Sequence, residues 1–201
     1  ALEALVRIHL DGHRLDALLA TLEARIASDP TRQSYHGDLA RTLLLAGETS
    51  KLVTALERAR KTFPGSGAIA LGLARACRQA KRPEDALVQY DAAARLINAP
   101  DPAICAEQVE LWLELGRADD VRALARRLVA DRLDTDPVEA VAAQCARAGA
   151  WELAASLLDE TMKTIPASRA LLSLSAARYW KRAGRGDEAL AHYRQAVRLS
   201  P

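Results

Sequence analysis

The chain has 201 residues, half of them hydrophobic, and its 28 basic and 26 acidic residues leave a formal net charge of only +2. Glycine and proline are too few for a disordered chain, and the near-balanced charge argues against a dedicated nucleic-acid binder, which usually carries a basic excess. No apolar run approaches the roughly 20 residues that a membrane-spanning helix needs, so we expect no direct membrane insertion.

The predicted elements are short helices separated by glycine and proline turns. Residues 1–10 have the pattern of the end of a helix, which Asp11-Gly12 breaks. The next helix, 14–27, ends at Ser28-Asp29-Pro30, because proline cannot continue a helix and restricts the residue before it. The following helix starts at 31 or 34 and runs to 46. The later predicted helices are 49–62, 68–80, 83–97, 102–115, 118–132, 137–148, 151–164, 168–183 and 187–199. No segment shows the sustained alternation of a β-strand, so the fold class is all-α with antiparallel helix pairs.

One turn residue recurs between the two helices of each pair. These residues are Gly12, Gly47, Lys81, Gly116, Gly149 and Gly184, and the intervals between them are 35, 34, 35, 33 and 35 residues. A fixed period of this length is typical of a repeat array, in which each repeat buries its apolar face on its neighbours. We therefore expect one elongated array over 1–201, with repeats at about 1–30, 31–66, 67–101, 102–136, 137–168 and 169–201.

Aligning the repeats on the turn residue produces columns of small and apolar side chains. Seven residues before the turn lie Leu5, Ala40, Ala74, Val109, Ala142 and Ala177. Five residues after the turn lie Ala17, Leu52, Ala86, Val121, Ala154 and Ala189. Twelve residues after it lie Ala24, Ala59, Ala93, Leu128, Thr161 and Ala196. Small residues in register allow two helices to approach closely. Larger residues four before the turn, such as Trp112 and Trp180, are expected to fill the layer between helices.

The period and the columns resemble the tetratricopeptide repeat, a helix–turn–helix unit. The resemblance covers essentially the whole chain and is strongest in repeats two, three and six, where 185–196 reads RGDEALAHYRQA and Pro201 follows. In repeat four, Val121, Ala125, Leu128 and Leu133 depart from the usual Ala, aromatic, Ala and Pro. Related helical repeats are the alternative. The resemblance implies a right-handed superhelical solenoid in which the first helix of each pair lines a concave groove that binds a peptide or protein segment.

The resemblance also implies which side chains face that groove. They form basic, acidic and basic bands with leucines between them. The candidate partner-binding residues are Arg41, Leu44, Leu45, Leu71, Arg75, Arg78, Glu110, Leu113, Glu114, Arg178, Lys181 and Arg182. Because a guanidinium group can grip a carboxylate bidentately, we hypothesise that Arg41, Arg75 and Arg78 contact an acidic partner segment. The alternative is a solvated charged face with ordinary pairs within each helix.

Several other binding and catalytic arrangements are missing. The single asparagine, Asn98, leaves neither a Lys/Asn carboxylate clamp nor an asparagine ladder in the groove. Gly65-Ser66-Gly67 lacks the Lys-Ser/Thr of a phosphate loop. The odd number of widely spaced cysteines favours buried core residues over disulfides or zinc ligands. The four histidines are scattered. We therefore predict no catalytic residue, no metal and no cofactor. The residues concerned are Cys77, Cys105, Cys145, His9, His13, His36 and His192.

The sequence supports two functions. The first is a non-catalytic scaffold that binds a partner segment in its groove. The alternative, by analogy with bacterial tetratricopeptide arrays, is an accessory region of a larger bacterial machine for glycan synthesis or exopolysaccharide export. The Arg-rich, Lys-poor, Ala-rich composition is typical of a high-GC bacterium and is compatible with either function. The compartment, bacterial cytoplasm or periplasm, stays open. The apolar residues of the last helix lack a predicted cover, so an end-to-end dimer or a continuation of the array is expected. They are Ala189, Leu190, Tyr193, Ala196 and Val197.

Overall fold

The computed structural model describes residues 14–97, 101–132 and 135–199, and within these ranges it contains helices and no strand. The chain divides into two compact units, 1–100 and 101–201. Predictions that fall on residues 1–13, 98–100, 133–134 and 200–201 lie outside the described residues, among them those for Gly12, Leu5, His9, His13, Asn98, Leu133 and Pro201. The prediction that six repeats form one superhelical array stays a prediction.

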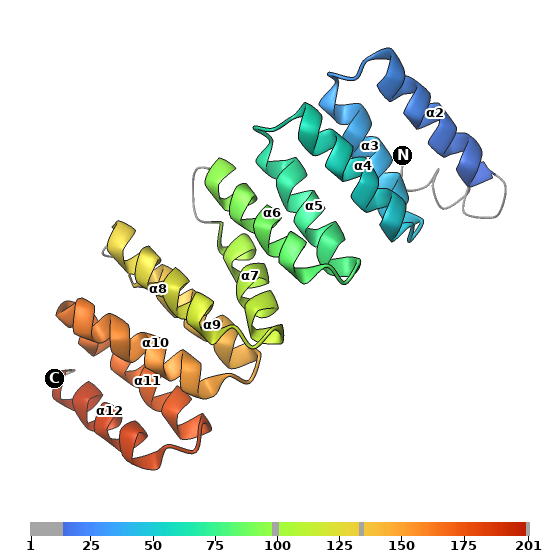
Figure 1. Ribbon diagram of the computed structural model, residues 1–201. Coiled ribbons are helices and arrows are strands. Elements are labelled where there is room, and N and C mark those ends of the chain that lie inside the picture. The colour runs from blue at the N-terminus through green and yellow to red at the C-terminus, as the bar shows by residue number, and fades with distance from the viewer. Residues whose placement is uncertain (1–13, 98–100, 133–134, 200–201) are drawn as a thin grey trace. The chain divides into compact units, whose positions relative to one another are not determined.

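In the first unit, consecutive helices pack side by side in the order of the sequence (Figure 1). The helices are α2 (Arg14–Ser28), α3 (Gln33–Leu45), α4 (Thr49–Thr62), α5 (Gly67–Gln79) and α6 (Pro83–Leu96). Helix α5 starts at an N-cap, because the Ser66 side chain accepts a hydrogen bond from the backbone N–H of Ile69. Pro83 occupies the first turn of α6, where a missing N–H costs nothing.

The second unit is built in the same way. Its helices are α7 (Pro102–Glu114), α8 (Ala118–Arg132), α9 (Asp136–Arg147), α10 (Trp151–Thr164), α11 (Arg169–Arg182) and α12 (Gly186–Leu199), and a short 3₁₀ turn, Pro166–Ser168, precedes α11. The predicted bounds match those of the structure within one residue at nearly every helix end. The all-α fold and the helix pairs are therefore confirmed.

The turns between paired helices share one backbone conformation. Gly47, Gly116, Gly149 and Gly184 have φ of 73°, 70°, 81° and 80°, in the left-handed region that favours glycine. Lys81 has φ of 60°, so it adopts the glycine conformation at the position where the sequence places it as a substitute. The N–H of Arg82 then bonds to the Cys77 carbonyl at 2.9 Å, which closes the helix end in a Schellman motif.

The packing columns form the core of both units. Ala74, Val109, Ala142 and Ala177 are buried, as are Ala86, Val121 and Ala154 in the facing helices. Trp112 and Trp180 are buried too, which confirms their prediction as core residues. In α2, Ala17 and Ala24 are exposed, and the predicted partner helix over 1–10 lies outside the described residues, so the columns of the first repeat stay a prediction.

Candidate functional site

The first unit contains a pocket between α3 and α5. Its volume is about 360 Å³, and α4 forms its floor. Each of the three helices contributes one face to it, because the left-handed turn after α3 and the Phe63-Pro64-Gly65 connection bring α3 and α5 alongside the same helix α4. The lining residues are Gln33, His36, Gly37, Ala40, Arg41, Leu44, Leu52, Leu56, Ala59, Ala68, Ile69, Gly72, Arg75, Ala76 and Gln79.

Two glycines keep this pocket open. A Cβ atom placed on Gly37 of α3 would meet no heavy atom within 4 Å. A Cβ atom on Gly72 of α5 would only touch Leu56 of the floor, at 3.7 Å from Cδ2. Neither glycine is needed for a left-handed backbone, and glycine inside a helix costs about 1 kcal/mol relative to alanine. What both glycines provide is space.

The pocket combines an apolar floor with a polar rim. Leu52, Leu56 and Ile69 are buried in the floor, whereas Arg41 and Arg75 are exposed on opposite helices. Arg41 forms no ion pair with any residue in the described ranges. The pocket can therefore offer van der Waals contact to an apolar group and the Arg41 guanidinium group to a carboxylate.

Side-chain contacts at the first turn of α3 hold this end of the pocket in place. The Gln33 side-chain amide of α3 donates to the Ser66 hydroxyl at the start of α5, at 2.9 Å. His36 packs edge-on against Phe63, with ring centroids 5.2 Å apart. Its Nε2 lies 3.0 Å from the Pro30 carbonyl oxygen, so Nε2 carries the proton that it donates. His36 thus links α3 to the loop that precedes it and to the connection between α4 and α5.

The predicted site residues of the first unit fall into two groups. Arg41, Leu44 and Arg75 line the pocket, and their role in partner binding stays a prediction. Leu45, Leu71 and Arg78 lie on the same helices but outside the pocket lining. Gly37, Gly72 and His36 also line the pocket but are not among the twelve candidate partner-binding residues. The signal for the glycines was available, since both interrupt helices that need no glycine.

In the second unit, the predicted acidic band contacts neighbouring helices. Glu110 of α7 accepts a hydrogen bond from the Gln144 amide of α9. Glu139 of α9 accepts one from the Ser175 hydroxyl of α11, at 3.0 Å. These contacts join the first helices of successive pairs, so the acidic side chains contribute to the stacking of the repeats.

The remaining predicted site residues of the second unit are arranged less compactly. Leu113 is half-buried and Glu114 is exposed on α7, while Arg178 and Lys181 are exposed on α11. The Arg182 guanidinium stacks over the Trp151 ring at 5.6 Å from its centroid. The three basic residues therefore share a helix, and one of them already has an aromatic partner.

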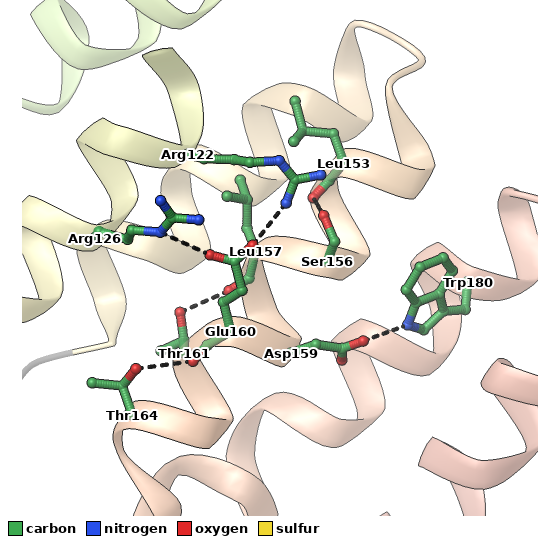
Figure 2. A network of polar contacts seen from close by, with 10 residues as sticks. All are labelled: Arg122, Arg126, Leu153, Ser156, Leu157, Asp159, Glu160, Thr161, Thr164 and Trp180. Atoms are coloured by element: carbon green, nitrogen blue, oxygen red, sulfur yellow. Dashed lines mark hydrogen bonds and ion pairs between the residues drawn. The ribbon is translucent and has the colours of Figure 1, made fainter. Parts of the chain in front are cut away.

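A second polar network joins the later helices of the pairs (Figure 2). Arg122 and Arg126 of α8 both pair with Glu160 of α10, at 2.8 and 3.1 Å. Asp159 of α10 accepts a hydrogen bond from Trp180 Nε1 at 3.0 Å. These contacts bridge successive repeats, so Arg122, Arg126, Asp159 and Glu160 have a structural role.

The three cysteines are poorly placed for nucleophilic chemistry. Cys77 and Cys145 are buried and Cys105 is half-buried. Burial raises the pKa of all three thiols, that of Cys145 to about 11, so the nucleophilic thiolate form is disfavoured. In the described ranges, no three His, Cys, Asp or Glu side chains come together as a metal site. None of the described helices has the length and apolar character to cross a membrane.

Comparison with known proteins agrees with this architecture. No protein-family model matches the chain, and no curated protein matches it. Solved structures do match. YrrB, described as a tetratricopeptide repeat protein with an unusual peptide-binding site, shares 14% identity and a TM-score of 0.52 over 90% of this chain and 92% of its own.

Two further solved structures extend the likeness. A tetratricopeptide repeat protein from Parabacteroides merdae ATCC 43184 shares 13% identity with a TM-score of 0.55, over all of this chain and 79% of its own. A chain of the Naa15/Naa10 structure bound to HypK-THB shares 16% identity with a TM-score of 0.55, over 98% of this chain and 31% of its own. This chain therefore has the fold of the tetratricopeptide repeat proteins, as its periodicity predicts.

Proposed function

We propose that this protein is a non-catalytic interaction scaffold that binds a segment of a partner protein in the pocket between α3 and α5. The observation that carries the proposal is the combination of an aliphatic floor, two exposed arginines on the rim and the space left by Gly37 and Gly72. Its volume of about 360 Å³ lies within the range of pockets that hold small ligands or peptide side chains.

The residues that line the pocket indicate which kind of partner segment would fit it. An aliphatic or aromatic side chain would cover the floor at Leu52 and Leu56, and burial of such a side chain contributes about 1.5–3 kcal/mol. An Asp, Glu or terminal carboxylate next to it would reach Arg41 or Arg75. The likeness to YrrB supports this proposal, because the description of that protein includes a peptide-binding site.

Selection from a random peptide library displayed on phage tests the proposal. We expect the wild-type chain to enrich peptides in which an apolar residue lies close to an acidic one. Gly37→Leu should abolish their binding because the side chain fills the pocket, whereas Gly37→Ala should retain most of it. Both variants should fold, since nothing lies within 4 Å of a Cβ at this position.

The charge of the rim is tested by a matched pair of variants. Arg41→Glu should weaken the selected peptides about tenfold or more, because loss of a charge-assisted pair and new repulsion together exceed 1.4 kcal/mol. Arg95→Glu reverses an exposed arginine of α6 outside the pocket and should leave binding unchanged. Equal binding by wild type, Arg41→Glu and Gly37→Leu would refute the pocket as the binding site.

The alternative role in a bacterial glycan-synthesis or exopolysaccharide-export machine is a different proposal. It rests on analogy with bacterial tetratricopeptide arrays, and the fold alone does not determine function. The sequence of the complete gene would test it: a transferase or an export component encoded in the same chain would favour this alternative over a free-standing scaffold.

A further inference from the structure

A second pocket of the first unit lies on another face of α3. Its volume is about 470 Å³, and residues of α2 and α4 form its two walls while α3 forms its floor. Leu19 of α2 and Leu39 and Leu43 of α3 line it and are buried, so its base is apolar. We call this pocket the α2–α4 groove. His36 of α3 lines both this groove and the pocket between α3 and α5, so the two are neighbours.

The groove is separate from the surface of α2 that faces the predicted first helix. Four residues of α2 line the groove and share one face of the helix: Leu19, Glu23, Ile26 and Ala27. At 100° per residue, Ala17 and Ala24 lie about 120° away from the middle of that face. These two alanines are the residues of α2 expected to pack against the predicted helix at 1–10, so the groove does not depend on where that segment lies.

The two walls of the groove carry opposite charges. Lys51 and Arg58 of α4 and Glu23 of α2 line it, and all three side chains are exposed. The side chains of Arg58 and Glu23 form no ion pair with any residue in the described ranges. Lys51 pairs with Glu48, which directly precedes its own helix, at 3.6 Å. The groove therefore presents two cations on one wall and an anion on the other.

Ion pairs bridge the corresponding spaces between later second helices of the pairs. Arg82, just before α6, pairs with Glu57 of α4 at 3.2 Å. Arg185, just before α12, pairs with Glu152 of α10 at 3.3 Å. Two arginines of α8 pair with Glu160 of α10 beside a pocket of about 340 Å³ (Figure 2). In these three places, charged side chains of the chain itself join the neighbouring helices.

Among the described residues, no ion pair crosses the α2–α4 groove. Arg58 lies eleven residues after Gly47, and Glu160 lies eleven residues after Gly149. Helix α4 thus has an arginine at the repeat position where α10 has the acid that joins it to α8. The charges of the α2–α4 groove are therefore available to a group from outside the described chain.

We infer that the α2–α4 groove binds an amphipathic helix of a partner protein. The lining residues extend over 19–27 of α2 and 50–58 of α4, so each wall is about 12 Å long, or two helical turns. A groove of this kind accepts apolar side chains at i, i+3 or i+4 and i+7 of an inserted helix. The apolar base at Leu19, Leu39 and Leu43 would take these side chains.

The charges of the walls define the flanks of the partner helix. Lys51 and Arg58 are seven residues apart, so acidic residues at i and i+7 of a helix alongside α4 would reach both. A basic residue on the opposite flank would reach Glu23. Because these charges are exposed, they contribute more to the choice of partner than to its affinity. The site lies outside the pocket of the proposed function and does not depend on it.

Selection from a phage library of helical peptides randomised on one face tests the inference. The wild-type 201-residue chain is the bait. Peptides that also bind Thr54→Trp are removed, because Thr54 is an exposed residue of the groove wall and tryptophan would fill the groove. We expect the remaining peptides to carry an apolar strip with Asp or Glu along one flank, and to gain helix content on binding. A selection without such peptides, or peptides that bind without becoming helical, would overturn the inference.

Fluorescence anisotropy of the selected peptides tests the charged wall. Arg58→Glu should weaken binding about tenfold or more, and lysine in place of the acidic peptide residues should reverse this preference. Arg95→Glu, at an exposed arginine of α6 outside the groove, is the matched control and should bind like the wild type. Circular dichroism should show the same helix content in these variants, because each changed side chain is exposed.

A further variant separates this inference from the proposed function. Gly37→Leu closes the pocket between α3 and α5 and should leave binding of the helical peptides unchanged, since Gly37 does not line the α2–α4 groove. Equal binding by the wild type and Arg58→Glu would overturn the inference, as would a loss of binding in Gly37→Leu or an equal loss in Arg95→Glu.

Discussion

At the scale of single residues, Lys81 adopts the left-handed backbone conformation of the turn although it is not a glycine. It has φ of 60°, the only described non-glycine residue with a positive φ. The left-handed conformation costs an L-residue about 1–2 kcal/mol, while glycine loses about 0.5–1 kcal/mol more entropy on folding. The turn therefore tolerates lysine at a net cost that glycine would remove.

Lys81→Gly should raise the free energy of unfolding by about 0.5–1 kcal/mol. Gly149→Ala, at the same turn position with φ of 81°, should lower it by about 1–2 kcal/mol. Urea denaturation of the two variants beside the wild type measures both effects. A loss of stability in Lys81→Gly would mean that contacts of the lysine side chain, and not the backbone, hold this turn.

Cys145 makes stability depend on pH in the alkaline range. Burial raises its pKa from 9.0 to about 11. A folded-state pKa above the unfolded one stabilises the fold fully below the unfolded value, and this contribution is lost as the pH rises through the folded value. Between about pH 9 and pH 11, the wild type should therefore lose about 2 kcal/mol more than Cys145→Ala. Parallel pH dependence in both proteins would contradict a buried thiol.

At the scale of elements, the helices could be predicted from the sequence because their ends are chemically marked. The turn residue, Pro83 and Pro102 fix where helices stop or start, and tertiary packing does not need to override them. The first helices of the pairs were predicted to carry the site, and Arg41, Leu44 and Arg75 do line a pocket on two of them.

The other predicted site residues make contacts between repeats. The residue pattern of a single helix does not contain these contacts, so it could not predict them. Glu110 was predicted to face a partner, but it accepts a hydrogen bond from Gln144, one repeat further along the chain. Glu139 and Ser175 are related by nearly the same interval. Complementary polar residues about 34 positions apart were the available signal that these acids join repeats. The space above Gly37 could not be predicted, because it depends on what α5 places opposite.

The packing columns should be sensitive to side-chain volume. Ala154 of α10 is fully buried, so Ala154→Leu should destabilise the protein by about 1–3 kcal/mol through overpacking. Ala123→Leu at an exposed site of α8 is the control and should change stability by less than about 0.5 kcal/mol. Thermal unfolding followed by circular dichroism compares them. Equal stability of the two variants would show that the small residues do not set the distance between helices.

At the scale of the whole molecule, the two units of the chain have the same architecture but differ on the first helices of their pairs. The first unit offers a glycine-opened pocket with an arginine on each side. In the second unit, the corresponding helices use Glu110, Gln144, Glu139 and Ser175 to contact one another. We therefore propose that partner binding belongs to the first unit and that the second unit contributes mainly scaffold.

Hydrogen exchange of the full chain, with and without a peptide selected by the wild type, tests the pocket most directly. The account predicts added protection of backbone amides in α3 and α5, at 33–45 and 67–79, and unchanged exchange in α9 and α11. The same peptide should cause no protection in Gly37→Leu. Protection limited to the second unit, or protection of α3 and α5 that persists in Gly37→Leu, would contradict the assignment of partner binding to this pocket.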